Sequence, residues 1–247
     1  MAKYPGWKNF PTIQFKEIIA ELVDAKEEQK AVMIIAPTGA GKTNAINAFK
    51  AKSSEHTYVF TLGDSYNLPI LLNEVLGVFG FNIHHWKNMK HIALRKISQH
   101  LTELHDQGHR PVFILDEAEN ARIPMLKAVK ELYDAIVGKC GIVLIGTDQL
   151  IDQLNKKSLG QSIPQLRRRF KAGTRFISRI NKAKDMNAFF DEFIPGNEDL
   201  KDLLIQICDN YGELHDYLHP FLVNCEKKKI APTVDNFRMY HKIPKTK

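Results

Sequence analysis

The chain alternates between two kinds of hydrophobic pattern along most of its length. Short apolar runs at 31–35, 57–61, 112–115 and 141–145 are typical of strands buried in a parallel sheet. Between them, apolar residues recur every three or four positions and predict amphipathic helices over 12–30, 42–52, 68–79, 90–107 and 124–137. Strands that alternate with helices predict an α/β fold, a parallel sheet flanked by helices.

The pattern changes toward the C-terminus. Residues 174–177 fit one more strand, and beyond them the sequence predicts helices over 183–193, 197–210 and 212–227. Pro220 is expected to kink or break the last of these helices. We therefore expect two domains. Residues 1–180 would form a sheet-containing core with an N-terminal helical segment, and residues 181–247 a small helical subdomain with a basic tail.

Composition narrows the class of protein. The 247 residues are 44% hydrophobic and 26% charged, as in ordinary globular proteins, and the three cysteines are too few and too scattered for a disulfide framework or a zinc knuckle. No apolar run approaches the roughly 20 residues that cross a bilayer, and the start lacks a signal-peptide pattern. We expect a soluble, cytoplasmic protein with no membrane partner. The net charge of +7 favours a polyanionic partner.

The strand at 31–35 runs directly into a glycine-rich turn, Ala36-Pro37-Thr38-Gly39-Ala40-Gly41-Lys42-Thr43, and then into a helix. This is a phosphate-binding loop, with alanine at the position where its first glycine is more usual. The glycines let several backbone N–H groups point at one anion, and the helix adds its positive end. The alternative, a chance glycine-rich turn, is disfavoured because the strand, loop and helix all match. The residues expected to bind ATP are Pro37, Thr38, Gly39, Ala40, Gly41, Lys42, Thr43 and Asn44.

Side chains of the loop, together with polar residues at two further strand ends, suit the chemistry of ATP hydrolysis. Lys42 is expected to reach the β and γ phosphates, and the Thr43 hydroxyl to bind Mg²⁺. Asp116 would hold the same Mg²⁺ through water, while Glu117 would orient the attacking water; the alternative is that this pair caps the next helix. Thr147 follows the strand at 141–145 and would contact the γ-phosphate or the attacking water, unless it caps the following segment.

Three consecutive arginines, Arg167 to Arg169, precede Phe170. Arginine stabilises charge on a transferring phosphoryl group because its planar guanidinium donates several hydrogen bonds and stays ionised. One of the three could therefore be an arginine finger supplied by a neighbouring subunit, and the sequence does not decide which. The alternatives are a solvated helix face or contacts with nucleic-acid phosphates.

Taken in this order, the motifs between residues 31 and 179 resemble the AAA+ ATPases, P-loop NTPases with a C-terminal helical lid. The stretches 143–150, 116–119 and 168–170 resemble, more narrowly, the transposition regulators: phage Mu B and the target-selecting ATPases of related transposons. The resemblance implies an ATPase that uses ATP and Mg²⁺. It implies Lys42, Asp116, Glu117 and Thr147 as catalytic residues and Arg169 as the finger, and it makes residues 181–247 the lid.

The resemblance also implies partners. Members of this family form homo-oligomeric filaments or rings on double-stranded DNA with little sequence preference and present the DNA to a transposase, and DNA and partner stimulate hydrolysis. The candidates for DNA contact are Lys87, Lys90 and Lys96, whose alternative is an ordinary solvated helix face. Glu213 departs from the pattern, because many relatives have a lid arginine there. The other functions to weigh are a helicase-loader or replication-initiation ATPase and a nucleotide-switched DNA scaffold with little hydrolysis.

Overall fold

The computed structural model describes residues 6–81, 90–155 and 162–244. The chain divides into two compact units. The sheet unit comprises Glu17–Ala36 and Ala45–Ile177, and the helical unit comprises Met1–Lys16, Pro37–Asn44 and Ser178–Lys247. The phosphate-binding loop thus groups with the C-terminal helices, although both of its flanking segments belong to the sheet unit. The expected division at residue 180 stays a prediction.

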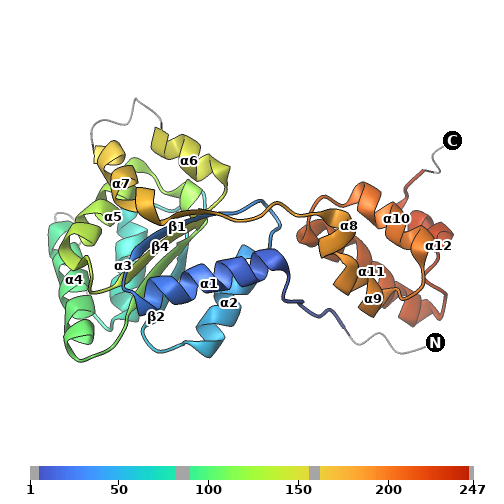
Figure 1. The fold of residues 1–247 in the computed structure, drawn as a ribbon, viewed down its shortest axis with the longest axis horizontal. Helices are drawn as coiled ribbons and strands as arrows, with labels where there is room; N and C mark the ends of the chain where they lie inside the picture. The colour runs from blue at the N-terminus through green and yellow to red at the C-terminus, as the bar shows by residue number, and fades with distance from the viewer. Residues whose placement is uncertain (1–5, 82–89, 156–161, 245–247) are drawn as a thin grey trace. The chain divides into compact units, whose positions relative to one another are not determined.

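The sheet unit is built on five parallel strands, which confirms the predicted α/β class. They are β1 (Ala31–Ile35), β2 (Thr57–Thr61), β3 (Val112–Asp116), β4 (Gly141–Gly146) and β5 (Thr174–Phe176), in the order β2-β3-β4-β1-β5 (Figure 1). The register pairs Ile35 with Gly146 and Thr61 with Asp116. The carboxyl ends of these strands therefore meet at one edge of the sheet.

Helices cover both faces of this sheet (Figure 1). On one side are α1 (Ile13–Glu27) and α2 (Lys42–Lys52), and on the other α3 (Leu68–Val78), α4 (Lys90–Asp106) and α5 (Ile123–Ile136). The remaining helical segments of this unit are η1 (Ala118–Asn120), α6 (Asp148–Asn155), α7 (Ser162–Phe170) and η3 (Lys171–Gly173). Phe60, Phe113, Leu101 and Leu126 are buried in its core, where each such side chain contributes about 1.5–3 kcal/mol.

The helical unit has a hydrophobic core of its own. Its helices are α8 (Lys182–Asp185), α9 (Asn187–Phe193), α10 (Glu198–Ile207), α11 (Tyr211–Lys228) and α12 (Val234–His241). Phe190, Phe221 and Phe237 are buried at its centre. The N-terminal segment adds Trp7, whose ring stacks on that of Phe193 with centroids 4.7 Å apart.

Several predicted elements need correction. The single helix expected over 183–193 is wrong, because the chain turns at Met186 between α8 and α9. The predicted break at Pro220 is also wrong: α11 continues through it to Lys228. Pro220 removes one backbone donor at a cost of about 3 kcal/mol, which burial of the adjacent Phe221 and Leu222 offsets. The pattern missed α6, α7 and α12. Among the described helices, none has the length and apolarity needed to cross a bilayer.

Candidate nucleotide-binding site

The phosphate-binding loop leaves the sheet next to the end of β4. The Ala36 N–H donates to the Gly146 carbonyl at 2.9 Å, and the chain then enters the loop. Gly39 and Gly41 have φ angles of +70° and +85°, in the left-handed region that glycine adopts without penalty. The Lys42 ammonium donates to the Pro37 carbonyl at 3.1 Å across the loop, and α2 begins at Lys42. The expected loop residues therefore surround the N-terminal end of a helix, where an anion is favoured.

Within the helical unit, the loop packs against the start of α11. A Cβ added to Gly39 would lie 2.1 Å from Asn210 Oδ1, so no larger residue fits there. Gly212 lies near the same side chain but with more room, because its added Cβ would lie 3.1 Å from Asn210 Oδ1. Asn210 is therefore a neighbour of the phosphate-binding loop that the sequence pattern did not identify.

Glu213, the residue that departs from the expected lid arginine, takes part in a capping box at the start of α11. Asn210 Oδ1 accepts from the Glu213 N–H at 3.0 Å, and Asn210 Nδ2 donates to Glu213 Oε1 at 2.8 Å. The Asp209 N–H donates to Glu213 Oε2 at 2.7 Å. Both carboxylate oxygens thus satisfy donors at the helix start. Glu213 therefore stabilises the start of α11, and this position carries no positive charge that could contact a phosphate.

The two carboxylates at the end of β3 lie in different environments. Asp116 is 1% exposed, and its Oδ1 accepts from the Glu117 N–H at 2.9 Å. Glu117 is exposed and has φ 53° and ψ 42°, the left-handed conformation. A non-glycine residue there costs about 1–2 kcal/mol, and such strain is common at functional positions. Glu117 occupies the N-cap position of η1 but makes no side-chain capping bond, which argues against the capping alternative for this residue.

Asn120, just beyond the acidic pair, connects the end of β3 to the chain that follows β2. Asn120 Nδ2 donates to the Leu62 carbonyl at 2.7 Å and to Glu117 Oε2 at 3.3 Å. Sequence reasoning gave no role to Asn120, although it lies only three positions after Glu117. The side chain therefore ties the exposed carboxylate to the chain that follows β2.

Glu119 links the end of β3 to the end of β4. Its Oε1 accepts from Thr147 Oγ1 at 3.0 Å and from the Thr147 N–H at 3.3 Å. Its Oε2 is buried and has no hydrogen-bond partner among the described residues. Gly146 leaves the room that this carboxylate needs, since an added Cβ would lie 2.3 Å from Oε2. Glu119 thus fixes the Thr147 hydroxyl, whose role toward nucleotide stays a prediction.

The arginine cluster divides into paired and exposed members. Arg169 makes a bidentate ion pair with Asp134 on α5, with Nε–Oδ1 2.5 Å and Nη2–Oδ2 2.9 Å. Although burial raises the pKa of Asp134, hydrogen bonds from Arg169 and Lys130 hold that pKa below its usual value. Arg167 and Arg168 are exposed. A role for Arg169 as finger stays a prediction and requires release of Asp134. Arg168 and Arg169 both line an open cavity of about 520 Å³, so the cavity does not distinguish between them.

The structure gives two of the three candidate DNA contacts a partner within the chain. Lys90 Nζ lies 2.6 Å from Glu131 Oε1, and Lys96 Nζ lies 5.4 Å from the centroid of the Phe81 ring. Lys87 lies outside the described residues. Exposed ion pairs of this kind contribute less than about 1 kcal/mol, so a DNA phosphate can compete with them.

A phosphate-binding loop between β1 and α2 of this parallel sheet defines the class of P-loop nucleotide-binding proteins. The AAA domain family matches residues 25–154, more than half of the chain, and the protein belongs to that family. This confirms the AAA+ ATPase class; nucleotide binding by this chain is part of the proposal below. Comparison with curated protein sequences gives no significant match.

Solved structures show the same fold. A Walker-type ATPase of Pyrococcus abyssi superimposes with a TM-score of 0.57 at 15% identity, over 91% of this chain and 71% of that one. A structure of Drosophila ORC bound to AT-rich DNA superimposes with a TM-score of 0.45 at 10% identity, over 92% and 81% of the two chains. At such low identity the first likeness is one of fold, and the second is too loose to support an argument.

Proposed function

We propose that this AAA+ protein is an ATPase that binds double-stranded DNA with little sequence preference, oligomerises on it as a filament or ring, and delivers it to a transposase. One arrangement carries the ATPase part: the chain leaves β1 for a phosphate-binding loop, β3 ends in Asp116 and Glu117, and β4 is followed by Thr147. The transposition part is supported by the residue patterns at 143–150 and 168–170.

In this proposal, the loop N–H groups and Lys42 bind the phosphates of ATP. The Thr43 hydroxyl and the Asp116 carboxylate supply oxygen ligands of the kind that Mg²⁺ prefers. When bound, Mg²⁺ would neutralise charge on the phosphates. Glu117 orients the attacking water, and its bond to Asn120 restricts the positions that its carboxylate can take.

The DNA part depends on the positive charge of the chain. With a net charge of +7, the protein attracts a polyanion, and each phosphate contact releases counterions. Lys87, Lys90 and Lys96 are the proposed contacts. At Lys90 and Lys96, a DNA phosphate would replace weak contacts with Glu131 and Phe81. DNA affinity should therefore fall steeply as the salt concentration rises.

Nucleotide binding is tested by paired substitutions on α2. Lys42→Ala should reduce Mg²⁺-ATP affinity at least tenfold, because it removes the cation on the phosphates. Lys50→Ala removes the same charge from an exposed position of the same helix and should leave affinity unchanged. Equal affinity in the two variants, measured by calorimetry, would contradict the proposed site.

Hydrolysis is tested by Glu117→Gln, which keeps the size and the hydrogen-bonding capacity of the side chain but removes its charge. We expect ATP binding to be retained and turnover to fall roughly 10²- to 10⁴-fold, the contribution of a positioned general base. Unchanged turnover would exclude Glu117 as the catalytic carboxylate.

If the protein assembles on DNA, negative-stain microscopy should show filaments or rings only when ATP and double-stranded DNA are both present. A preference for single-stranded DNA would instead favour a helicase loader. Assemblies of equal lifetime with ATP and with a non-hydrolysable analogue would favour a nucleotide-switched scaffold. A monomer under every nucleotide and DNA condition would refute assembly on DNA.

A further inference from the structure

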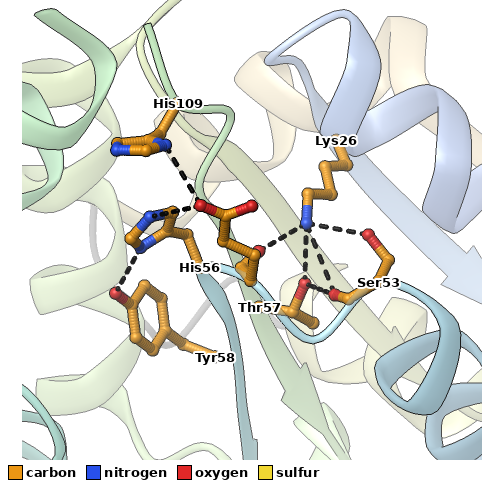
Figure 2. A network of polar contacts seen from close by, with 7 residues as sticks. Lys26, Ser53, His56, Thr57, Tyr58 and His109 are labelled. Atoms are coloured by element: carbon orange, nitrogen blue, oxygen red, sulfur yellow. Dashed lines mark hydrogen bonds and ion pairs between the residues drawn. The ribbon is translucent and has the colours of Figure 1, made fainter. Parts of the chain in front are cut away.

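A second cluster of polar side chains, shown in Figure 2, lies where β2 and β3 begin, whereas Asp116 and Glu117 lie where β3 ends. Glu55 and His56 immediately precede β2, and His109 lies just before β3. The Val112 N–H donates to the His56 carbonyl at 2.9 Å, so the paired strands bring the two histidines together. Five strand residues, about 16 Å, separate His56 from the carboxyl end of β2.

Three potential metal ligands converge in this cluster. Glu55 Oε1 lies 3.5 Å from His56 Nε2 and 3.4 Å from His109 Nδ1. One ligand atom from each residue falls within 4.8 Å of the others, and the two imidazole centroids are 4.2 Å apart. In a tetrahedral zinc site with bonds of about 2.0–2.1 Å, neighbouring ligand atoms lie about 3.3–3.4 Å apart. The observed spacings to Glu55 nearly match that value before any ion is bound.

We propose that Glu55, His56 and His109 bind a divalent transition-metal ion such as Zn²⁺, with a fourth position open to solvent. Two imidazoles and a carboxylate are a ligand set that Zn²⁺ commonly takes, and Zn²⁺ sites with three protein ligands keep the fourth position for water or another small ligand.

The backbone positions of the three ligands are fixed by the fold. The buried ammonium of Lys26 donates to the Glu55 carbonyl at 2.6 Å. The His109 N–H donates to the Leu104 carbonyl at 3.0 Å, in the turn that ends α4. His56 has a left-handed backbone with φ 51°, which sets the direction of its side chain. The ligands therefore lose little backbone freedom when a metal binds.

An outer contact orients one imidazole for binding. His56 Nδ1 lies 3.4 Å from the Tyr58 hydroxyl, so a proton on Nδ1 can be donated to that oxygen (Figure 2). The lone pair of Nε2 is then directed toward Glu55. Metal-bound histidines commonly use their second nitrogen in this way, which fixes the tautomer.

The cluster lies in an open cavity of about 490 Å³ that a hydrated ion can enter. Lys52 and Arg110 also line it, and Arg110 forms an ion pair with Glu27. Nearby positive charge weakens attraction for a cation but favours an anion, such as hydroxide, at its open position. We therefore expect an exchangeable site rather than a permanently filled one.

The test uses the full chain, stripped of metal with a chelator and titrated with Co²⁺, whose visible absorption reports tetrahedral coordination, and with Zn²⁺ by calorimetry. We expect one equivalent to bind. Glu55→Gln and His109→Ala should each weaken binding at least tenfold, and Glu55→Gln keeps the shape of the side chain and the Lys26 contact to the backbone.

A matched control is His105→Ala. His105 Nδ1 lies 3.2 Å from Asp106 Oδ1, a histidine–carboxylate pair of similar spacing that has no third ligand among the residues the structure describes. His105→Ala and Lys42→Ala should bind Zn²⁺ as the unsubstituted chain does, which separates this site from the nucleotide loop. Absence of stoichiometric binding, or equal affinity in Glu55→Gln, His109→Ala and His105→Ala, would overturn the proposal.

Discussion

Replacing Gly146 by alanine tests whether Glu119 fixes the end of β4. The added Cβ would lie 2.3 Å from Glu119 Oε2, roughly 1 Å or more inside normal van der Waals contact. Since the φ of Gly146 is not in the left-handed region, the backbone accepts alanine and the clash is with the carboxylate. Oε2 is the end of a flexible side chain, so the carboxylate turns away from the new methyl group and its two bonds from Thr147 to Oε1 are strained.

The magnitude follows from these contacts. A hydrogen bond to a charged group contributes about 1.5–3 kcal/mol, and overpacking costs about 1–3 kcal/mol. Because the carboxylate is displaced and its bonds are strained rather than lost, we expect Gly146→Ala to lower the free energy of unfolding by about 1–3 kcal/mol. Glu119→Ala alone should cost about 1–3 kcal/mol, because it removes the bonds from Thr147 but leaves space. In that background, Gly146→Ala should cost less than about 0.5 kcal/mol.

The assay is urea unfolding of the unsubstituted chain, the two single variants and the double variant. Gly77→Ala serves as the control, because its added Cβ meets nothing within 4 Å on α3, and it should be neutral or stabilising. Additivity of the two substitutions to within about 0.5 kcal/mol would refute the inference that Glu119 and Gly146 are coupled.

Three further predictions concern other contacts. Asn210→Ala should lower thermal stability by about 1 kcal/mol through loss of the α11 cap, and Asn210→Ser, which keeps an acceptor for the Glu213 N–H and adds no charge beside the Glu213 carboxylate, should lose less in the same melting experiment. Trp7→Ala should cost about 2–4 kcal/mol by removing its stacking on Phe193, and a melting temperature that does not change would contradict this. Burial lowers the pKa of His100, so the folded state binds fewer protons, and stability falls as the pH drops below the unfolded value of about 6.5. The loss in melting temperature between pH 7.5 and 5.5 should therefore be smaller in His100→Leu than in the unsubstituted chain.

The sheet was predictable because its strands are short apolar runs bounded by turns. The bounds predicted for β1, α2 and β2 match the structure, since each is fixed by local pattern. The pattern failed where apolar residues are few. α7, over Ser162–Phe170, contains three consecutive arginines, and its buried residues Leu166 and Phe170 are too sparse to give a clear period.

The candidate site was predictable where its residues are adjacent in sequence, as in the phosphate-binding loop and the Asp116–Glu117 pair. Contacts between distant positions carry no local signal. Asn210 packs against Gly39 from 171 positions away, and His109 joins Glu55 only because β2 pairs with β3. Such contacts depend on topology, which periodicity alone does not specify.

Because Glu117 has a left-handed backbone, fold stability and the proposed catalysis favour different residues at this position. Glycine there would relieve about 1 kcal/mol of conformational strain, and asparagine would relieve part of it. The substitutions that make the fold more robust at this turn are therefore those that delete the carboxylate. A screen of variants for heat resistance alone would select chains that have lost the proposed catalytic carboxylate, so selection for stability here must be paired with selection for turnover.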